Sequence, residues 1–280
     1  MQGLGAHEDM NEFSREAIRQ SGYLRDGFAD FYDANRPGPP DVVLDALARY
    51  TGRDRLDLVV DLGSGTGLSA RTWSSRAGDV VGVEPNPAML SVAEARSTEP
   101  NVRYVAAFAD ETGLPAASVD LVTCSQSFHW MERESVLAEA ARLLRPGGVF
   151  AAYDYDMPPL VHPEVDAAFR EHLELRGRFR DRHKVEAGWT RVPKATHLDA
   201  IRDSGHFSYT REAVFHDAGE VDADRILRLA RSLGLVSELL ALGVTEEDLG
   251  LSELAAATHR VVGDRTVGWV LGYRVRLGVK

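Results

Sequence analysis

The sequence predicts an α/β fold: a Rossmann-like, seven-stranded, mostly parallel sheet with helices on both faces. Three observations support this prediction. Apolar strand-like runs alternate with helix-like segments through the first half of the chain, and a glycine-rich turn directly follows the first run. The chain has 280 residues, 44% of them hydrophobic and 27% charged, which suits one large globular domain. Alternating strands and helices imply right-handed crossovers and a sheet covered on both faces.

The first half of the chain contains five strand-like runs. Helical patterns separate several of them, and the helix in "RESVLAEAARLL" ends where "RPGG" supplies proline and glycine. We expect these strands at residues 56–63, 79–85, 101–109, 118–127 and 149–155.

The rest of the chain predicts two additions to this sheet. Residues 160–203 are polar, aromatic and helix-like, so we expect a helical cap inserted after the fifth strand, over the carboxyl edge of the sheet. A strand-like run near residue 210, two amphipathic helices and a final strand at 265–280 follow. Residues 1–50 are rich in aromatic side chains and predict a helical lid, which leaves 51–280 as the cofactor-binding domain.

Composition narrows the class of protein. The net charge of −11 argues against a protein that binds the nucleic-acid backbone. Cys124 is the single cysteine, so no internal disulfide forms, and we expect a reducing cytoplasm. We find no signal-like start, no bilayer-crossing stretch and no metal-ligand spacing, so we expect neither a membrane partner nor a metal. The oligomeric state stays open.

The turn "DLGSGTGLS", residues 61–69, is the first candidate site, because ligands of open parallel sheets bind beyond the carboxyl ends of the strands. Glycine at alternate positions allows close backbone approach. The match to the dinucleotide pattern G-x-G-x-x-G is partial, since Leu68 occupies the third glycine position. No lysine follows as in a phosphate-binding P-loop.

Two acidic residues indicate which ligand the turn binds. Asp61 precedes the glycines, where a carboxylate repels a pyrophosphate and attracts an ammonium group. Glu84 ends the second strand at the spacing of about 20 residues typical of a ribose-binding carboxylate. A ligand with a ribose, an ammonium group and no phosphate satisfies both, and S-adenosylmethionine is such a ligand.

Four motifs in register resemble the class I S-adenosylmethionine-dependent methyltransferases, in particular the small-molecule enzymes similar to ubiquinone-pathway and trans-aconitate methyltransferases. The motifs are "VVDLGSGTGLSA", "VVGVEPNPAMLSVA", "SVDLVTCSQSFHWM" and "LLRPGGVF". The resemblance covers about residues 25–155, and the remainder is only loosely similar.

The resemblance implies a set of cofactor-binding residues. Asp61, Gly63, Ser64 and Gly65 would hold the methionine end, and Glu84 would bind the ribose. The other residues that the resemblance places at the cofactor are Met89, Ala109 and Asp110 near the adenine, Ser125 and Gln126 near the methyl group, and Tyr32 and Arg36 over the methionine moiety. Family members often carry an acidic residue where this chain has Phe108.

The acceptor site is predicted from aromatic residues and one histidine. His129 is the candidate catalytic base, because its side chain titrates near neutral pH and it follows the fourth strand. The expected substrate-binding residues are Phe28, Phe128, Trp130 and Trp189.

We therefore expect methyl transfer to an oxygen or carbon of a small molecule, for example in a biosynthetic pathway of specialised metabolism. Three alternatives stay open: carboxyl methylation of a small organic acid, a different reaction of the bound S-adenosylmethionine, and an NAD-dependent oxidoreductase.

Overall fold

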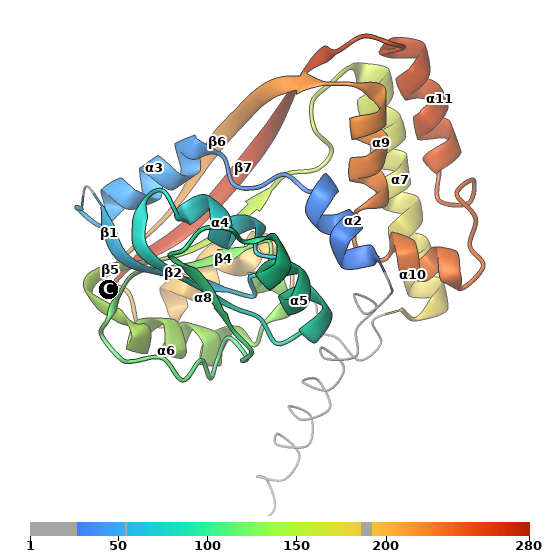
Figure 1. Ribbon diagram of the computed structural model, residues 1–280. Helices are drawn as coiled ribbons and strands as arrows, with labels where there is room; N and C mark the ends of the chain where they lie inside the picture. The colour runs from blue at the N-terminus through green and yellow to red at the C-terminus, as the bar shows by residue number, and fades with distance from the viewer. Residues whose placement is uncertain (1–26, 54, 186–191) are drawn as a thin grey trace, which may run out of the picture.

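A seven-stranded sheet forms the centre of the protein, and the computed structural model describes residues 27–53, 55–185 and 192–280 (Figure 1). The strand order is β3-β2-β1-β4-β5-β7-β6. The first five strands are parallel, and β7 runs antiparallel to both of its neighbours, β5 and β6. The predicted fold class is confirmed. The strands are β1 (Leu56–Leu62), β2 (Ala77–Val83), β3 (Val102–Val105), β4 (Val119–Ser125), β5 (Leu144–Tyr155), β6 (Tyr209–Val221) and β7 (Val267–Val279).

Helices cover both faces of this sheet because successive strand residues point to opposite sides. Val59 belongs to a core shared with α3 (Asp41–Tyr50) and α4 (Leu68–Trp73). Its neighbour Val60 belongs to a second core, shared with α6 (Arg133–Leu143) and α8 (His197–Asp203). The central strands are therefore buried on both faces, which explains why they read as continuous apolar runs.

A helical bundle forms a third core beyond the far end of the β6–β7 hairpin (Figure 1). The chain contributes to it twice, after β5 and between β6 and β7. Its helices are α7 (Pro163–His183), α9 (Ala223–Arg231), α10 (Val236–Ala241) and α11 (Leu251–Val261). The expected cap at 160–203 thus contains α7 of this bundle and also α8, which packs on β6 and β7. No helix in the described part of the chain is long and apolar enough to span a membrane.

Helix α2 (Phe28–Asn35) connects the sheet domain to the bundle, because it contacts both α5 (Pro87–Arg96) and α9. Asp33 on α2 accepts a 2.6 Å hydrogen bond from Arg71 of α4. The carbonyl of Asn35 accepts a hydrogen bond from Arg225 of α9. Residues 1–26 of the predicted lid lie outside the described residues, and the division of the chain at residue 50 stays a prediction.

The strand order reverses at β1. The chain moves outward from β1 to β2 and β3, then returns to β4 on the other side of β1. The crevice beyond the carboxyl ends of β1 and β4 is the usual ligand site of such sheets.

Candidate active site

The glycine turn at the end of β1 has the backbone conformation that requires glycine. Gly63, Gly65 and Gly67 have φ of 64°, 55° and 83°, in the left-handed region that side chains disfavour. A Cβ atom on Gly63 would lie 2.8 Å from the Cβ of Ser127, so the loop after β4 packs directly against this turn. A Cβ on Gly65 would meet nothing within 4 Å. The turn is therefore crowded at its base and open at Gly65.

Asp61 and Glu84 are buried carboxylates on either side of this turn. Asp61 is fully buried, and its Oδ1 accepts a 2.6 Å hydrogen bond from the Thr123 hydroxyl of β4. Its Oδ2 has no hydrogen bond to any residue that the structure describes. Glu84 is 7% exposed, and its two oxygens accept hydrogen bonds from the backbone N–H groups of Gly65 (2.9 Å) and Asn86 (2.8 Å). Each Glu84 oxygen retains a second lone pair for a further donor.

Burial controls the charge of both carboxylates. It raises the pKa of Asp61 to about 7, although hydrogen bonds from Thr123 and Ser69 oppose the shift. Burial likewise raises the pKa of Glu84 to about 7, against the hydrogen bonds from Asn86 and Gly65. A cationic or hydroxyl-bearing ligand would offset this desolvation cost, whereas a pyrophosphate would face two acidic groups.

The predicted adenine site lies between α5 and the loop after β3. The Asn86 side chain accepts hydrogen bonds from the N–H groups of Ala88 and Met89 and so caps α5. Met89 is 5% exposed and packs with Phe28 of α2. Ala109 is buried and Asp110 is half-buried. Phe28, predicted to bind substrate, thus contacts a residue predicted to bind the cofactor.

The residues predicted to cover the methionine moiety lie at the end of α2. The guanidinium of Arg36 lies 4.8 Å from the ring centre of Tyr32 and 5.5 Å from that of Tyr155, at the carboxyl end of β5. Cation–π contacts of this kind stabilise a positive charge against aromatic faces. Arg36 therefore connects α2 to the strand ends where the ligand crevice lies.

The segment after β4 lies beside the glycine turn. The Ser127 hydroxyl donates a 2.7 Å hydrogen bond to the carbonyl of Leu62, at the end of β1. Gln126 has a φ of 57°, uncommon for a residue other than glycine, and follows the half-buried Ser125. Strained backbone of this kind concentrates at functional sites. Ser125 and Gln126 thus end β4 next to the predicted cofactor turn.

The aromatic triplet forms the 3-10 helix η2 (Phe128–Trp130), and its three side chains have different surroundings. Phe128 is 1% exposed and packs edge-on against Phe150, 5.4 Å away in the second sheet core. It was expected to bind substrate, but this placement leaves almost none of its surface for a ligand. Trp130 is half-buried, with its ring 5.1 Å from that of His129. Trp189, also predicted to bind substrate, lies outside the described residues.

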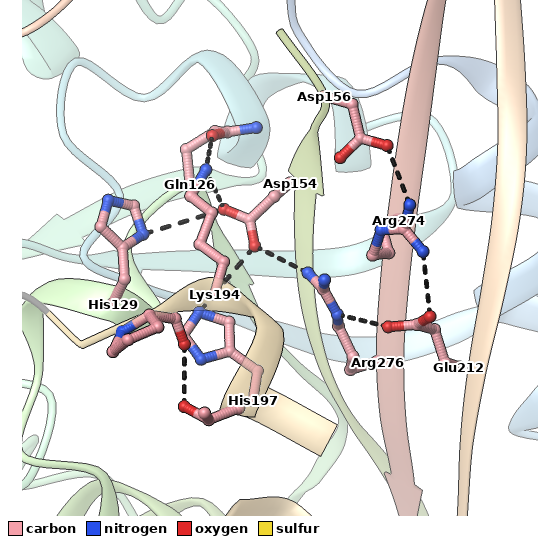
Figure 2. Close-up of polar contacts among 11 residues, drawn as sticks. Gln126, His129, Asp154, Asp156, Lys194, His197, Glu212, Arg274 and Arg276 are labelled. Carbon is pink, nitrogen blue, oxygen red and sulfur yellow. Dashed lines mark hydrogen bonds and ion pairs between the residues drawn. The ribbon is translucent and has the colours of Figure 1, made fainter. Parts of the chain in front are cut away.

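His129 lies in a cluster of charged side chains that the sequence did not indicate (Figure 2). It is 2% exposed, and its Nδ1 lies 3.8 Å from Oδ1 of Asp154 on β5. The same Oδ1 is 2.7 Å from the ammonium of Lys194, in the 3-10 helix η3 (Lys194–Thr196). Lys194 also donates a 2.8 Å hydrogen bond to the Gln126 side chain. One signal in the sequence could have indicated this cluster. Asp154 lies near the end of a predicted strand, as Asp61 and Glu84 do.

Comparisons with known proteins agree with this geometry. The family described as "Methyltransferase domain" matches residues 60–152. An uncharacterised methyltransferase of Mycobacterium tuberculosis is 38% identical over 117 residues, which cover 42% of this chain and 46% of the relative. The chain thus spans about half the length of the curated relatives it matches.

Solved structures extend the likeness over most of the chain. A proposed type II methyltransferase from Anaeromyxobacter dehalogenans superposes with a TM-score of 0.68 at 25% identity, covering 87% of this chain and 97% of that one. The chain thus contains a methyltransferase domain and has the fold of the class I S-adenosylmethionine-dependent methyltransferases. A Haemonchus contortus phosphoethanolamine N-methyltransferase bound to S-adenosylhomocysteine shares this methyltransferase fold, with a TM-score of 0.56 at 18% identity over 95% of this chain and 60% of that one.

The methyltransferase cofactor, S-adenosylmethionine, fits the residues at the turn. Two buried oxygens there, Oδ2 of Asp61 and Oγ of Ser64, have no hydrogen bond to a described residue. The space in front of Gly65 is open. An ammonium group and ribose hydroxyls would supply the donors that these oxygens lack, so Asp61 and Glu84 are the residues that would hold the cofactor.

Proposed function

We propose that the protein transfers a methyl group from S-adenosylmethionine to an oxygen or carbon atom of a small molecule. The observation that carries the proposal is the pair of buried carboxylates, Asp61 and Glu84, flanking an open glycine turn in a methyltransferase fold. S-adenosylmethionine supplies a methyl group on a positively charged sulfur, and the sulfur keeps the bonding electrons when an acceptor atom takes the methyl carbon. The remaining tasks of orientation, water exclusion and proton removal belong to the protein.

The arrangement around the strand ends supports a small acceptor. Helix α2 contacts both α5 and α9, so the sheet domain and the bundle are joined next to the crevice. The overall charge of −11 disfavours a nucleic-acid acceptor. His129, close to the strained Gln126, is the proposed base, and it would remove a proton from the acceptor as the new bond forms.

Binding and turnover test the proposal separately. We expect calorimetry to detect S-adenosylmethionine and S-adenosylhomocysteine but not NAD(H). We also expect Asp61→Ala and Glu84→Ala each to weaken cofactor binding at least about tenfold, the loss of one charge-assisted contact. Asp79→Asn is the matched control. Asp79 is an exposed acid on β2, the strand that ends just before Glu84.

Turnover is tested with a panel of hydroxyl-, keto- and carboxyl-bearing metabolites, analysed by mass spectrometry. The expected result is a product heavier by one methylene group, formed together with S-adenosylhomocysteine. His129→Ala should lower kcat and leave the cofactor Kd unchanged. NAD(H) binding in place of S-adenosylmethionine would contradict the proposal.

A further inference from the structure

Strand β6 is the outermost strand at one edge of the sheet, and in the described part of the chain no strand pairs with its outer side (Figure 1). It pairs with β7 over thirteen consecutive residues, Tyr209–Val221. Strand β3, at the opposite edge, has only four residues. A long edge strand presents a row of backbone N–H and C=O groups to which another strand can bind. The β6 edge is therefore the longer of the two surfaces at which this sheet could be extended.

This edge lacks two features that commonly prevent edge strands from pairing. The strand contains no proline, and its pairing with β7 continues from residue to residue without a bulge. Two apolar side chains on it are also exposed, Tyr209 at 46% and Val214 at 47%. Charged side chains are the protection that remains. Like charges directly opposite one another destabilise a strand pair and opposite charges stabilise it, so the order of the charges decides whether a second strand is repelled or attracted.

The polar side chains of β6 are self-complementary about Val214. When two copies of the strand pair antiparallel around a two-fold axis at Val214, residues at equal distances along the chain from Val214 lie opposite each other. Arg211 of one copy then lies opposite Asp217 of the other. Glu212 likewise lies opposite His216. When the axis is moved by one residue in either direction, no charged residue or histidine of the strand lies opposite another.

The first of these pairs consists of two residues that have no ion pair with any residue that the structure describes. Arg211 is exposed, and it donates a 3.2 Å hydrogen bond to the hydroxyl of Tyr50 on α3. Asp217 is half-buried, and its burial together with the negative charge of Asp41 raises its pKa. A cation opposite Asp217 would offset both effects. Arg211 of a second copy would supply that cation.

The second pair lies on the other face of the sheet, because successive strand residues point to opposite faces. Glu212 accepts hydrogen bonds from Arg274 (3.0 Å) and Arg276 (2.8 Å) of β7, which fix its position (Figure 2). Its side chain is nevertheless 33% exposed, so its oxygens can accept a further donor. His216 is exposed and would supply that donor from a second copy. Complementary contacts would thus form on both faces of the joined sheets.

We propose that the protein forms a two-fold symmetric dimer in which the β6 strands of two copies pair antiparallel about Val214. The two sheets then become one continuous sheet with β6 of each copy inside it. The occupant of the edge is a second copy because one strand supplies both members of each complementary pair. The net charge of −11 opposes association, but charges more than about 8 Å apart are largely screened at physiological ionic strength. The dimer does not depend on the proposed function, since none of the predicted cofactor- or acceptor-binding residues lies on β6.

Sedimentation velocity of the full chain, at about 0.15 M salt and from roughly 1 to 100 µM protein, tests the dimer by charge reversal. We expect a monomer–dimer equilibrium. Arg211→Asp and Asp217→Arg should each weaken it at least about tenfold, because the symmetry places like charges opposite each other twice. The double variant restores opposite charges and should return the dimer Kd to within about threefold of the unmodified protein. Arg103→Asp, an exposed position on β3 at the other edge, is the control and should have no effect. A monomer over the whole range, or a dimer that charge reversal does not weaken, would overturn the inference.

Cysteine cross-linking tests the register independently of the charges. Cys124 is the single cysteine and is buried, so an introduced surface thiol is the reactive one. Residues opposite each other in an antiparallel pair have Cα atoms about 4.5–5.5 Å apart, within the range of a disulfide. Val214→Cys should therefore give a disulfide-linked dimer on mild oxidation, detected on a non-reducing gel. Thr210→Cys, on the same face, is the control and should not, because its two thiols would lie about 25 Å apart. A dimer that cross-links through Thr210→Cys, or through neither position, would assign the contact to a different surface and overturn the inference.

Discussion

Replacing Asp61 by Asn should stabilise the ligand-free protein while weakening its binding of S-adenosylmethionine. The side chain is fully buried, and burial raises its pKa from 3.8 to about 7. Asn has nearly the same shape and can still accept the hydrogen bond from Thr123, but it carries no charge to desolvate. The substitution therefore removes a cost of folding that the buried carboxylate imposes.

The size and the pH dependence of this effect follow from proton linkage. Because the folded pKa lies above the ordinary value, the folded protein binds the proton more tightly than the unfolded chain does. The carboxylate therefore costs nothing well below pH 3.8, and its cost grows as the pH rises toward 7. The cost is about 4 kcal/mol at pH 7.5 and about 2 kcal/mol at pH 5. The advantage of Asn should thus shrink by roughly half between these two pH values.

Thermal unfolding of the ligand-free protein at both pH values measures this effect. At pH 7.5, Asp61→Asn should raise Tm by roughly 8–16 °C, since about 1 kcal/mol corresponds to about 2–4 °C in a chain of this size. Burial also lowers the pKa of His172 and His197 to about 4, so acidification destabilises through them. Their contribution cancels when the variant and the unmodified protein are compared at the same pH. Asp79→Asn should show no such difference. A Tm for Asp61→Asn that is unchanged at pH 7.5, or raised equally at both pH values, would refute the reasoning.

Two further predictions concern the turn and helix α2. Gly67→Ala should destabilise the protein by more than Gly113→Ala, measured by denaturant unfolding. Both residues have positive φ, so an alanine at either position costs about 1–2 kcal/mol of folding free energy. Only at Gly67 would the new Cβ also collide with the Tyr104 side chain. Similar losses in both variants would contradict the close packing at this turn. Arg71→Met should cost about 1–3 kcal/mol, because its ion pair to α2 is only 10–15% exposed. Arg96→Met, which removes an exposed pair to the same helix, should cost clearly less; a larger loss for Arg96→Met would contradict the argument from burial.

The cofactor side of the site could be predicted from sequence because its signals are local. Asp61 lies near the end of a short apolar strand, the glycines and Glu84 follow directly after such strands, and parallel strands bring their carboxyl ends to one edge of the sheet. The hydrogen bond from Gly65 to Glu84 follows from that geometry. Their roles toward the cofactor stay predictions, but their juxtaposition needed no tertiary information beyond the sheet.

The acceptor side could not be predicted in the same way. Lys194 and Asp154 are 40 residues apart, and no periodicity links the segment before α8 to the end of β5. An aromatic residue after a strand fits a core as well as a pocket, which is why Phe128 was expected at the substrate and lies in the core. The amphipathic pattern of α9 and α11 showed that each helix buries one face. The pattern did not show that α11 packs against α7, a helix that comes from a different part of the chain, after β5.

The hairpin of β6 and β7 has a consequence for how this enzyme could change its specificity. Its two strands pair over thirteen residues each and end at the bundle, while the opposite ends lie in the central sheet. The far ends of the two strands, at Tyr209 and Val279, lie toward the amino end of β5, so the bundle stands beyond the carboxyl edge of the sheet, the edge at which Asp61 and Glu84 lie. We expect substitutions in the bundle core to alter the surface that faces this edge while the strand tips stay unchanged, so that acceptor preference could change while the donor is conserved.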